Sequence, residues 1–184
     1  VIHLAAAKGD FMISDREFYD DNVTATEAIV NLIKTLGVKK VIHYSTVSVY
    51  GHNNLRTDEK ALLKPNNIYG VTKLKSENIF LDWELNNDVD LTILRPSVIY
   101  GVNNYANMYN ILHLMNKKFP VSVGKGEYVK SMIALENLID ITLFSINNLS
   151  KLQIFNCTDS PYLKLCQVTD HIAEIDGFNK FKIR

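Results

Sequence analysis

The sequence predicts an α/β protein with a parallel sheet. Apolar, strand-like runs alternate with amphipathic helical stretches through the first hundred residues, an order typical of parallel strands joined by crossover helices. The chain has 184 residues, of which 47% are hydrophobic and 22% charged, so it is long and apolar enough to bury a core. No repeat, low-complexity tract or Pro/Gly-rich linker divides it.

The first half contains three expected strands and two expected helices. The first helix has the clearest boundaries, because Ser14 and Glu17 form a capping-box pattern at its start and Gly37 stands where helices commonly end. The strands are rich in Val and Ile, as buried parallel strands are. In chain order we expect a strand at 1–6, a helix at 14–36, a strand at 40–45, a helix at 68–86 and a strand at 91–94.

The pattern changes after Tyr100-Gly101, where shorter elements begin. Because no linker marks this change, residues 1–101 and 102–184 are interpreted as a larger part and a smaller α/β lobe of one body. In the lobe we expect helices at 107–117 and 135–147 and short strands at 121–123, 128–134 and 153–157.

The composition excludes several classes of function. Lys plus Arg total 20 and Asp plus Glu total 20, so no positive excess is available to bind a nucleic acid. No apolar run approaches the roughly 20 residues that span a bilayer. The five histidines lack metal-ligand spacing, so we expect no metal site. Two cysteines, Cys157 and Cys166, are too few for a disulfide framework and favour a reducing cytoplasm.

The first candidate for chemistry is a Tyr-x-x-x-Lys pair, Tyr69 and Lys73, which share one face of the second expected helix. Nine tyrosines and sixteen lysines produce about 0.8 such pairs by chance, so the spacing alone carries little weight. The alternative is a surface tyrosine stacked on a lysine stem. We expect the pair to point away from an apolar stripe that packs the helix, formed by Val71, Leu74, Leu81 and Leu85.

The position of Ser45-Thr46 strengthens this candidate. These hydroxyls end a parallel strand, at the edge where open α/β sheets bind their ligands. A tyrosine titrates near 10, so a tyrosine base at neutral pH needs a pKa lowered by roughly three units. A lysine ammonium and a cationic cofactor ring can together supply that change. The sequence therefore predicts proton-transfer chemistry around Thr46, Tyr69 and Lys73.

Asn22 is a second unusual residue, because an amide there falls on the apolar stripe of the first helix, between Phe18 and Ala25. A buried amide needs hydrogen-bond partners. Asn22 is therefore either part of a ligand site or a structural residue at a helix irregularity, and both interpretations stay open.

Five segments of the chain carry a resemblance to a known family. They stand in the order and spacing of the extended short-chain dehydrogenase/reductases, and the chain is most similar to the NAD-dependent nucleotide-sugar epimerases and dehydratases among them. Residues 130–138 and 154–157 resemble substrate-lobe signatures of epimerases from bacterial surface-polysaccharide synthesis. The five segments are 1–6, 21–23, 45–51, 69–73 and 94–101.

The resemblance implies a Rossmann-like, doubly wound parallel sheet with a small substrate lobe, and it assigns roles to the matching residues. Tyr69 would act as general base and acid, and Lys73 would hold the nicotinamide ribose of NAD and lower the tyrosine pKa. Thr46 would hydrogen-bond a hydroxyl of the sugar. The other implied cofactor-binding residues are Ala5, Ala6, Lys8, Asn22, Ser45 and Ser97.

The resemblance also implies that Asn107 and Lys130 contact the substrate diphosphate. Lys130 stands where arginine is common, so a point charge replaces a bidentate fork. The helices at 14–36 and 68–86 correspond to those that pair in homodimers of this family.

Two departures concern the cofactor site. The family's glycine-rich phosphate-binding turn, and the acidic residue that follows its second strand, have no counterpart here, since only Gly9 and Gly37 precede Gly51. We expect the chain to be an internal fragment that lacks its first βα units and a C-terminal tail, and to be inactive alone. The choice between NAD and NADP therefore stays open on these residues.

Among possible reactions the sequence favours 4-epimerisation of a UDP-hexose or UDP-N-acetylhexosamine by transient oxidation at C4. A 4,6-dehydratase needs an acid and a base to eliminate water. In dehydratases of the family that the chain resembles, an Asp-Glu pair directly follows the threonine, and Val47-Ser48 supply neither group. A keto-sugar reductase using NAD(P) remains open. So does a non-enzymatic interpretation, a redox-inert dinucleotide-binding scaffold.

Overall fold

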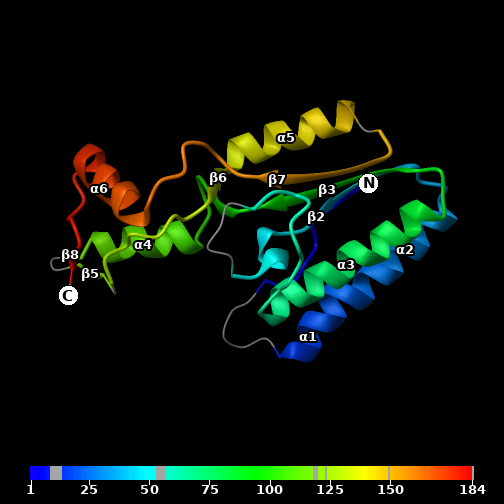
Figure 1. Ribbon diagram of the computed structural model, residues 1–184, viewed down its shortest axis with the longest axis horizontal. Coiled ribbons are helices and arrows are strands. Elements are labelled where there is room, and N and C mark those ends of the chain that lie inside the picture. Colours follow the sequence, from blue (N-terminus) through cyan, green and yellow to red (C-terminus); the bar gives the residue numbers. More distant parts are fainter. Residues whose placement is uncertain (9–13, 53–56, 118–119, 123, 149, 184) are drawn as a thin grey trace. The chain divides into compact units, whose positions relative to one another are not determined.

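The structure is a computed structural model that describes residues 1–8, 14–52, 57–117, 120–122, 124–148 and 150–183 (Figure 1). The chain forms two compact units. The first unit consists of Val1–Pro96 and Asp140–Cys157, and the second of Ser97–Ile139 and Thr158–Arg184. Because the chain leaves the first unit after Pro96 and returns to it at Asp140, the two units interleave along the sequence.

A four-stranded parallel sheet forms the centre of the first unit, as the sequence predicts. Strand β1 is shorter than the expected 1–6, since only Ile2 and His3 pair with the neighbouring strand. In spatial order the strands are β1 (Ile2–His3), β2 (Lys40–Tyr44), β3 (Asp90–Pro96) and β7 (Leu152–Cys157).

The expected helix at 14–36 begins and ends as predicted, but it is not continuous. Ser14 and Glu17 form the capping box, and Gly37 has a φ of +64°. Between these ends the chain forms α1 (Asp15–Tyr19), a π-helical turn (Asp20–Thr24) and α2 (Ala25–Thr35). The π turn widens the helix at Asn22, so the irregularity that its buried amide suggested is present.

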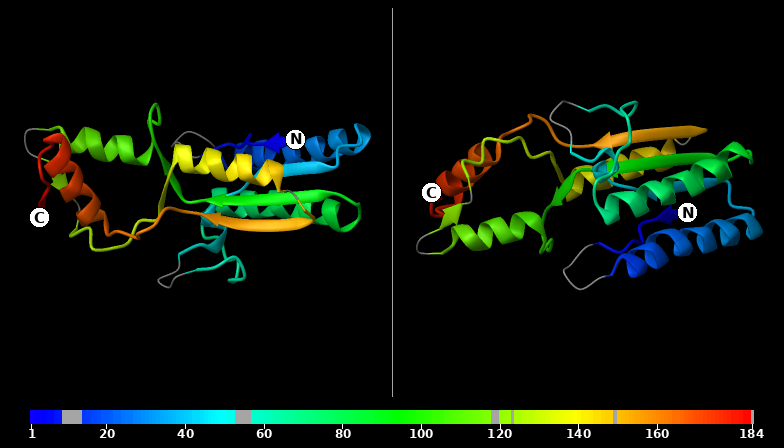
Figure 2. Two further views of the ribbon diagram at one scale, coloured as in Figure 1. Left: turned by 90° about the horizontal axis from the view of Figure 1, so that it is seen from above. Right: turned by 60° about the horizontal axis from the view of Figure 1, so that its bottom comes forward.

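Helices cover both faces of this sheet. Alternation along β2 turns His43 toward α3 (Ile68–Leu85), where its ring lies 4.7 Å from that of Phe80. The next residue, Tyr44, faces the other way and hydrogen-bonds Thr142 of α5 (Leu135–Asn147). Figure 1 accordingly shows α2 and α3 on one side of the strands and α5 on the other, and Figure 2 shows the same arrangement from two further directions.

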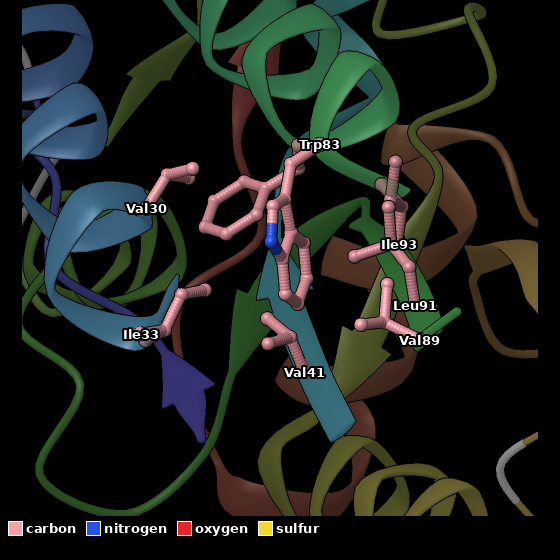
Figure 3. Close-up of a cluster of buried hydrophobic side chains, with 8 residues drawn as sticks. Val30, Ile33, Val41, Trp83, Val89, Leu91 and Ile93 are labelled. Carbon is pink, nitrogen blue, oxygen red and sulfur yellow. The ribbon is translucent and has the colours of Figure 1, made fainter. Parts of the chain in front are cut away.

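The hydrophobic core of the first unit lies between the sheet and α2–α3 (Figure 3). Burying one such aliphatic or aromatic side chain contributes about 1.5–3 kcal/mol. The indole of Trp83 lies in the middle of the cluster, with α2 on one side and the strands on the other. The buried members are Val30, Ile33, Val41, Phe80, Trp83, Val89, Leu91 and Ile93.

The predicted packing face of α3 is wrong. Leu85 of the expected apolar stripe is 81% exposed, whereas Lys73 is 2% exposed. The helix is apolar on its buried side only toward its C-terminal end. Nearer its start it packs through small and charged residues that find polar partners, which a search for leucines does not detect. The buried residues of α3 are Gly70, Thr72, Lys73, Ser76, Glu77, Phe80 and Trp83.

Small hydroxyl side chains bring α2 and α3 close together. The Oγ1 of Thr26 lies 2.8 Å from the Oγ of Ser76, and its hydroxyl also bonds the carbonyl oxygen of Asn22 at 2.7 Å. One turn away, the Asn22 amide donates to the Oγ1 of Thr72 at 2.9 Å. All four residues are buried, so these bonds satisfy groups that water does not reach.

The second unit contains a parallel pair of strands, β4 and β6, tied together by the carboxylate of Asp159. That carboxylate accepts hydrogen bonds from the Ala134 amide at 2.8 Å and the Tyr100 hydroxyl at 3.1 Å. The elements are β4 (Val98–Tyr100), α4 (Asn107–Met115), β5 (Val121–Ser122), β6 (Met132–Ala134), α6 (Leu165–Asp176) and β8 (Lys182–Ile183).

The sequence did not predict β4, α6 or β8, and the strand expected at 128–134 is confined to its last three residues. The residues before this strand instead lie against the loop that precedes α6, where the backbone amide of Lys130 donates a hydrogen bond to the carbonyl oxygen of Leu163. Within the described residues, no helix is both long and apolar enough to cross a membrane.

The buried hydroxyls of Thr26 and Ser76, which we call the hydroxyl seam, make a testable contribution to stability. Thr26→Val preserves side-chain shape but removes the hydrogen bonds of its hydroxyl to Ser76 and to the Asn22 carbonyl, so we expect the free energy of unfolding to fall by about 1–3 kcal/mol. Thr24→Val, on an exposed position of the preceding π turn, is the matched control and should change it by less than about 0.5 kcal/mol. Urea unfolding followed by circular dichroism measures both, and equal effects would contradict a stabilising role for the seam.

Candidate active site

The carboxyl end of β2 carries two of the expected site residues. Thr46 is buried, and its hydroxyl oxygen accepts the amide of Ser48 at 3.2 Å, which caps a 3₁₀ turn at Val47–Tyr50. Ser45 is also buried, and its hydroxyl is without a hydrogen-bond partner among the residues that the structure describes. A buried hydroxyl without a partner is unusual and marks a position where a ligand group can bind.

Helix α3 begins directly against this turn because residue 70 is a glycine. A Cβ atom on Gly70 would lie 2.6 Å from the carbonyl oxygen of Ser48 and 3.0 Å from the Cβ of Pro65. The cap of the helix holds the same residue, since the Asn67 side chain accepts the Gly70 amide at 2.7 Å. The absence of a side chain at this position therefore sets how closely Tyr69 approaches the 3₁₀ turn.

The structure brings Tyr69 and Thr46 together, and a side-chain hydrogen bond from Thr46 contributes to the Tyr69 pKa. Burial raises the pKa of the Tyr69 phenol above its ordinary value of 10, and the bond from Thr46 lowers it by a smaller amount. Lys73 is not among the causes that act on this pKa. The chain by itself therefore keeps Tyr69 protonated at neutral pH, and the lowered pKa that a base requires must come from groups bound beside it.

Lys73 is buried on the sheet side of α3, one turn after Tyr69. Burial lowers the pKa of its ammonium from 10.5 to about 8, against an opposing effect of the Glu77 carboxylate. Since the folded pKa lies below the unfolded one, the buried charge costs on the order of 3 kcal/mol below pH 8. This cost disappears as the pH rises from about 8 to 10.5, where the unfolded chain still holds the proton.

Two neutral histidines lie beneath this part of α3. The rings of His3 and His43 stack with their centroids 5.3 Å apart. Burial lowers the pKa of His3 to about 4 and that of His43 well below 6.5, and the Lys73 charge lowers both further. Both are structural residues of the buried interior, as the sequence predicts for its histidines.

Asn22 has a structural role, since it links the segment after β1 to α3. Its side-chain oxygen accepts the Ala7 amide at 2.7 Å, and its amide donates to the Ala7 carbonyl at 3.3 Å as well as to Thr72. These three bonds hold the segment after β1, in which Ala5, Ala6 and Lys8 are exposed. The expected cofactor contact of Asn22 stays a prediction, and its structural role accounts for the burial.

The other expected residues lie in the second unit. Ser97 is buried with a hydroxyl that has no partner among the described residues, and Asn107 is exposed at the start of α4. Lys130 is half-buried, which lowers the pKa of its ammonium. A largely apolar cavity of about 650 Å³ lies in this unit, and neither Asn107 nor Lys130 is among its described lining residues.

Sequence reasoning assigned no role to Glu77 and Arg95, although both are buried and ion-paired close to Lys73. Two signals in the sequence pointed to them. Glu77 follows Lys73 by four residues and so shares its helix face, and Arg95 continues the alternation of the buried Leu91 and Ile93.

Comparison with known proteins identifies the family. Residues 1–157 match the NAD dependent epimerase/dehydratase family. The chain belongs to this family. It is 33% identical over 180 residues to an N-acetyl-α-D-glucosaminyl-diphospho-ditrans,octacis-undecaprenol 4-epimerase of Escherichia coli O157:H7, covering 96% of this chain and 53% of that protein. It is 25% identical over 158 residues to a UDP-glucose 4-epimerase of Vibrio cholerae, covering 80% of this chain and 48% of that protein.

Solved structures confirm the Rossmann-like fold class. A UDP-glucuronic acid 4-epimerase from Bacillus cereus, in complex with NAD, matches with a TM-score of 0.88 at 22% identity, over 99% of this chain and 61% of that one. A UDP-N-acetylglucosamine 4-epimerase from Methanobrevibacter ruminantium M1 matches with a TM-score of 0.87 at 20% identity, over 99% and 62%. The chain spans about half the length of the curated relatives that it matches.

The close approach at Gly70 predicts an unusual effect of an alanine. Helix propensity alone favours Gly70→Ala by about 0.5–1 kcal/mol, but the clash with the Ser48 carbonyl should instead destabilise the fold by about 1–3 kcal/mol. Asn78→Ala, at an exposed position of the same helix, is the control and should leave stability unchanged or slightly higher. Thermal unfolding measures the stability of both variants. A stabilised Gly70→Ala variant would show that the 3₁₀ turn moves to accommodate the added methyl group.

Proposed function

We propose that the protein is an NAD-dependent sugar 4-epimerase acting on a UDP-hexose or UDP-N-acetylhexosamine in surface-polysaccharide synthesis. The observation that carries this proposal is the placement of Thr46, Tyr69 and Lys73 around one end of a parallel sheet. Membership of the family supports it, and so do the 4-epimerase activities of its relatives, one of which acts on a sugar joined to a lipid diphosphate.

The described residues fit a bound dinucleotide. Lys73 carries three donors and forms no ion pair among the described residues, and the Ser45 hydroxyl has no hydrogen-bond partner among them. We assign Lys73 and Tyr69 to the nicotinamide ribose, with Ser45 beside them, and Ser97, Ala5, Ala6, Lys8 and Asn22 to the remainder of the cofactor site. When bound, NAD would supply the hydride acceptor for oxidation at C4 of the sugar and the hydride donor for the reduction that follows.

The chain's own residues handle the proton. Tyr69 takes the proton of the C4 hydroxyl as the sugar is oxidised and returns it when the 4-keto group is reduced. Thr46, already hydrogen-bonded to Tyr69, orients that hydroxyl. The positive charge of the bound nicotinamide would stabilise the phenolate, since Lys73 does not itself shift the Tyr69 pKa in the chain alone. Asn107 and Lys130 are assigned to the diphosphate of the substrate.

A dehydratase is disfavoured by the residues that follow Thr46. The two residues after Thr46 belong to the 3₁₀ turn, where the Ser48 hydroxyl lies 3.2 Å from that of Thr46. Neither Val47 nor Ser48 offers a carboxyl group for elimination of water. One relative, from Dictyostelium discoideum, is nevertheless a dTDP-D-glucose 4,6-dehydratase at 27% identity, so the reaction test should monitor both products.

Substitution of the proposed base tests the reaction. Tyr69→Phe in the protein at its natural full length should lower turnover by at least about 10²-fold, because the general base is removed. Tyr19→Phe, an exposed tyrosine of α1, is the control and should retain full turnover. Proton NMR of the sugar ring after incubation with UDP-glucose, UDP-N-acetylglucosamine and N-acetylglucosaminyl-diphospho-undecaprenol identifies the product and the preferred carrier.

Three outcomes of this test would contradict the proposal. A Tyr69→Phe variant with full turnover would reject the base. Stoichiometric consumption of a reduced nicotinamide would indicate a reductase. Absence of conversion with all three substrates, by a protein that binds NAD, would favour a redox-inert scaffold.

We further propose that the protein works in the cytoplasm as a homodimer joined through α2 and α3. The two cysteines are unpaired, which favours a reducing compartment. Leucines at the ends of both helices are exposed, with Leu32 at 57%, Leu36 at 66% and Leu85 at 81%. The same helices bind the sheet with their other sides, so this outer surface is available to a second copy.

Charges on the outer surface of α2 and α3 test the dimer. The Leu32→Glu/Leu85→Glu variant should sediment as a monomer, because two like charges per copy would be buried at the interface. Leu62→Glu, which places a charge on an exposed leucine outside both helices, should leave the dimer intact. Analytical ultracentrifugation measures both variants, and a monomeric parent protein would contradict the proposal.

A further inference from the structure

A buried ion pair anchors the middle of α3 to the sheet. The Glu77 carboxylate accepts the Nε of Arg95 at 3.0 Å and its Nη2 at 2.6 Å, one oxygen to each nitrogen. The two side chains are 0% and 2% exposed. This fork geometry fixes both the position and the plane of the carboxylate.

Arg95 also contacts Tyr50 in the 3₁₀ turn, which is linked in turn to β7. Its Nη1 donates to the Tyr50 hydroxyl at 2.7 Å, and its guanidinium lies over the Tyr50 ring at 5.1 Å. The Tyr50 hydroxyl donates a hydrogen bond to the Oδ1 of Asn156 at 2.8 Å. Asn156 is the neighbour of Arg95 in the register between β7 and β3. We call this network of Glu77, Arg95, Tyr50 and Asn156 the clamp. It joins α3, the 3₁₀ turn and two strands.

Glu77 lies one helical turn after Lys73 on the same buried face. The other titratable groups facing that ammonium cannot balance its charge, since His3 on β1 and His43 on β2 are neutral and Tyr69 is protonated. Glu77 is the one buried carboxylate among the described residues. Its charge opposes the effect of burial on the Lys73 pKa.

The clamp also explains why the two charges do not simply pair. Both Glu77 oxygens are directed at Arg95, and among the described residues Lys73 forms no ion pair within 4 Å. A free carboxylate one turn away would attract the ammonium and occupy its donors. Held by Arg95, it acts through space and leaves those donors available to a ligand.

We propose that Glu77 is a positioning residue for Lys73: Arg95, Tyr50 and Asn156 hold its carboxylate where the charge keeps the buried ammonium protonated without binding it. The effect on catalysis rests on the function proposed above for Lys73. The electrostatic effect itself is a property of this chain and can be measured without cofactor or substrate.

The test is a pH titration of the Lys73 side-chain amine by NMR, with the resonance identified by its loss in Lys73→Arg. In the wild-type chain we expect a midpoint near pH 8. Glu77→Gln/Arg95→Met removes both buried charges together, so neither is left unpaired, and should lower that midpoint by about one pH unit or more. Glu84→Gln removes a carboxylate elsewhere on α3 and should not move it.

A folded double variant with an unchanged Lys73 midpoint would overturn the proposal and leave the pair a purely structural anchor. If the double variant does not fold, the wild-type chain still decides the question. The carboxyl carbon resonance of Glu77 should shift as Lys73 loses its proton, with the same midpoint, because the shielding of that carbon responds to the charge one helical turn away. A Glu77 resonance that stays constant through that pH range would also overturn the proposal.

The proposed function and the electrostatic role of Glu77 can each fail without the other. If the titration behaves as expected but the full-length protein converts no sugar, the electrostatic role of Glu77 stands and the epimerase does not. If the sugar is converted while Lys73 titrates independently of Glu77, the reverse holds.

Discussion

The burial of charge beneath helix α3 is the constraint on which the first unit depends. Lys73, Glu77 and Arg95 lie on the sheet side of the helix and together carry one net positive charge. Removing a single partner from such a buried pair costs about 3–5 kcal/mol, because the other charge is then left without water or a counter-ion. The bidentate contact and the hydroxyl of Tyr50 offset this desolvation and fix where the helix lies on the strands.

Close packing around the charged residues is equally specific. The hydroxyls of Thr26 and Ser76 bond directly between α2 and α3, and Gly70 brings the start of α3 against the turn after β2. A side chain at residue 70 would clash with the Ser48 carbonyl and so change how closely Tyr69 lies against this turn. The apolar cluster around Trp83 supplies most of the burial energy at the opposite end of the helix, so stability and chemistry occupy different turns of α3.

Burial sets the protonation equilibria of Tyr69 and Lys73 in the chain by itself. Burial raises the pKa of Tyr69 and lowers that of Lys73, so the chain alone disfavours both charged forms. A charge that binds at this buried position interacts more strongly with its neighbours, because the low dielectric screens the interaction less. In the function proposed above, a positively charged ring beside Tyr69 would therefore act on the phenol more strongly than it would in water.

The sequence by itself determined the alternation of elements, the capping box at Ser14, the end at Gly37 and the hydroxyl–tyrosine–lysine set, since these follow from local spacing and strand order. It placed the leucine stripe of α3 inward and left Arg95 without a role, because local apolarity carries no information about distant polar partners. Only the tertiary structure decided that Lys73 faces inward, since its burial is tolerable only where Glu77, from its own helix, is clamped by an arginine from a strand 18 residues later. Long-range electrostatic compensation, unlike periodicity, exists only once the chain is folded.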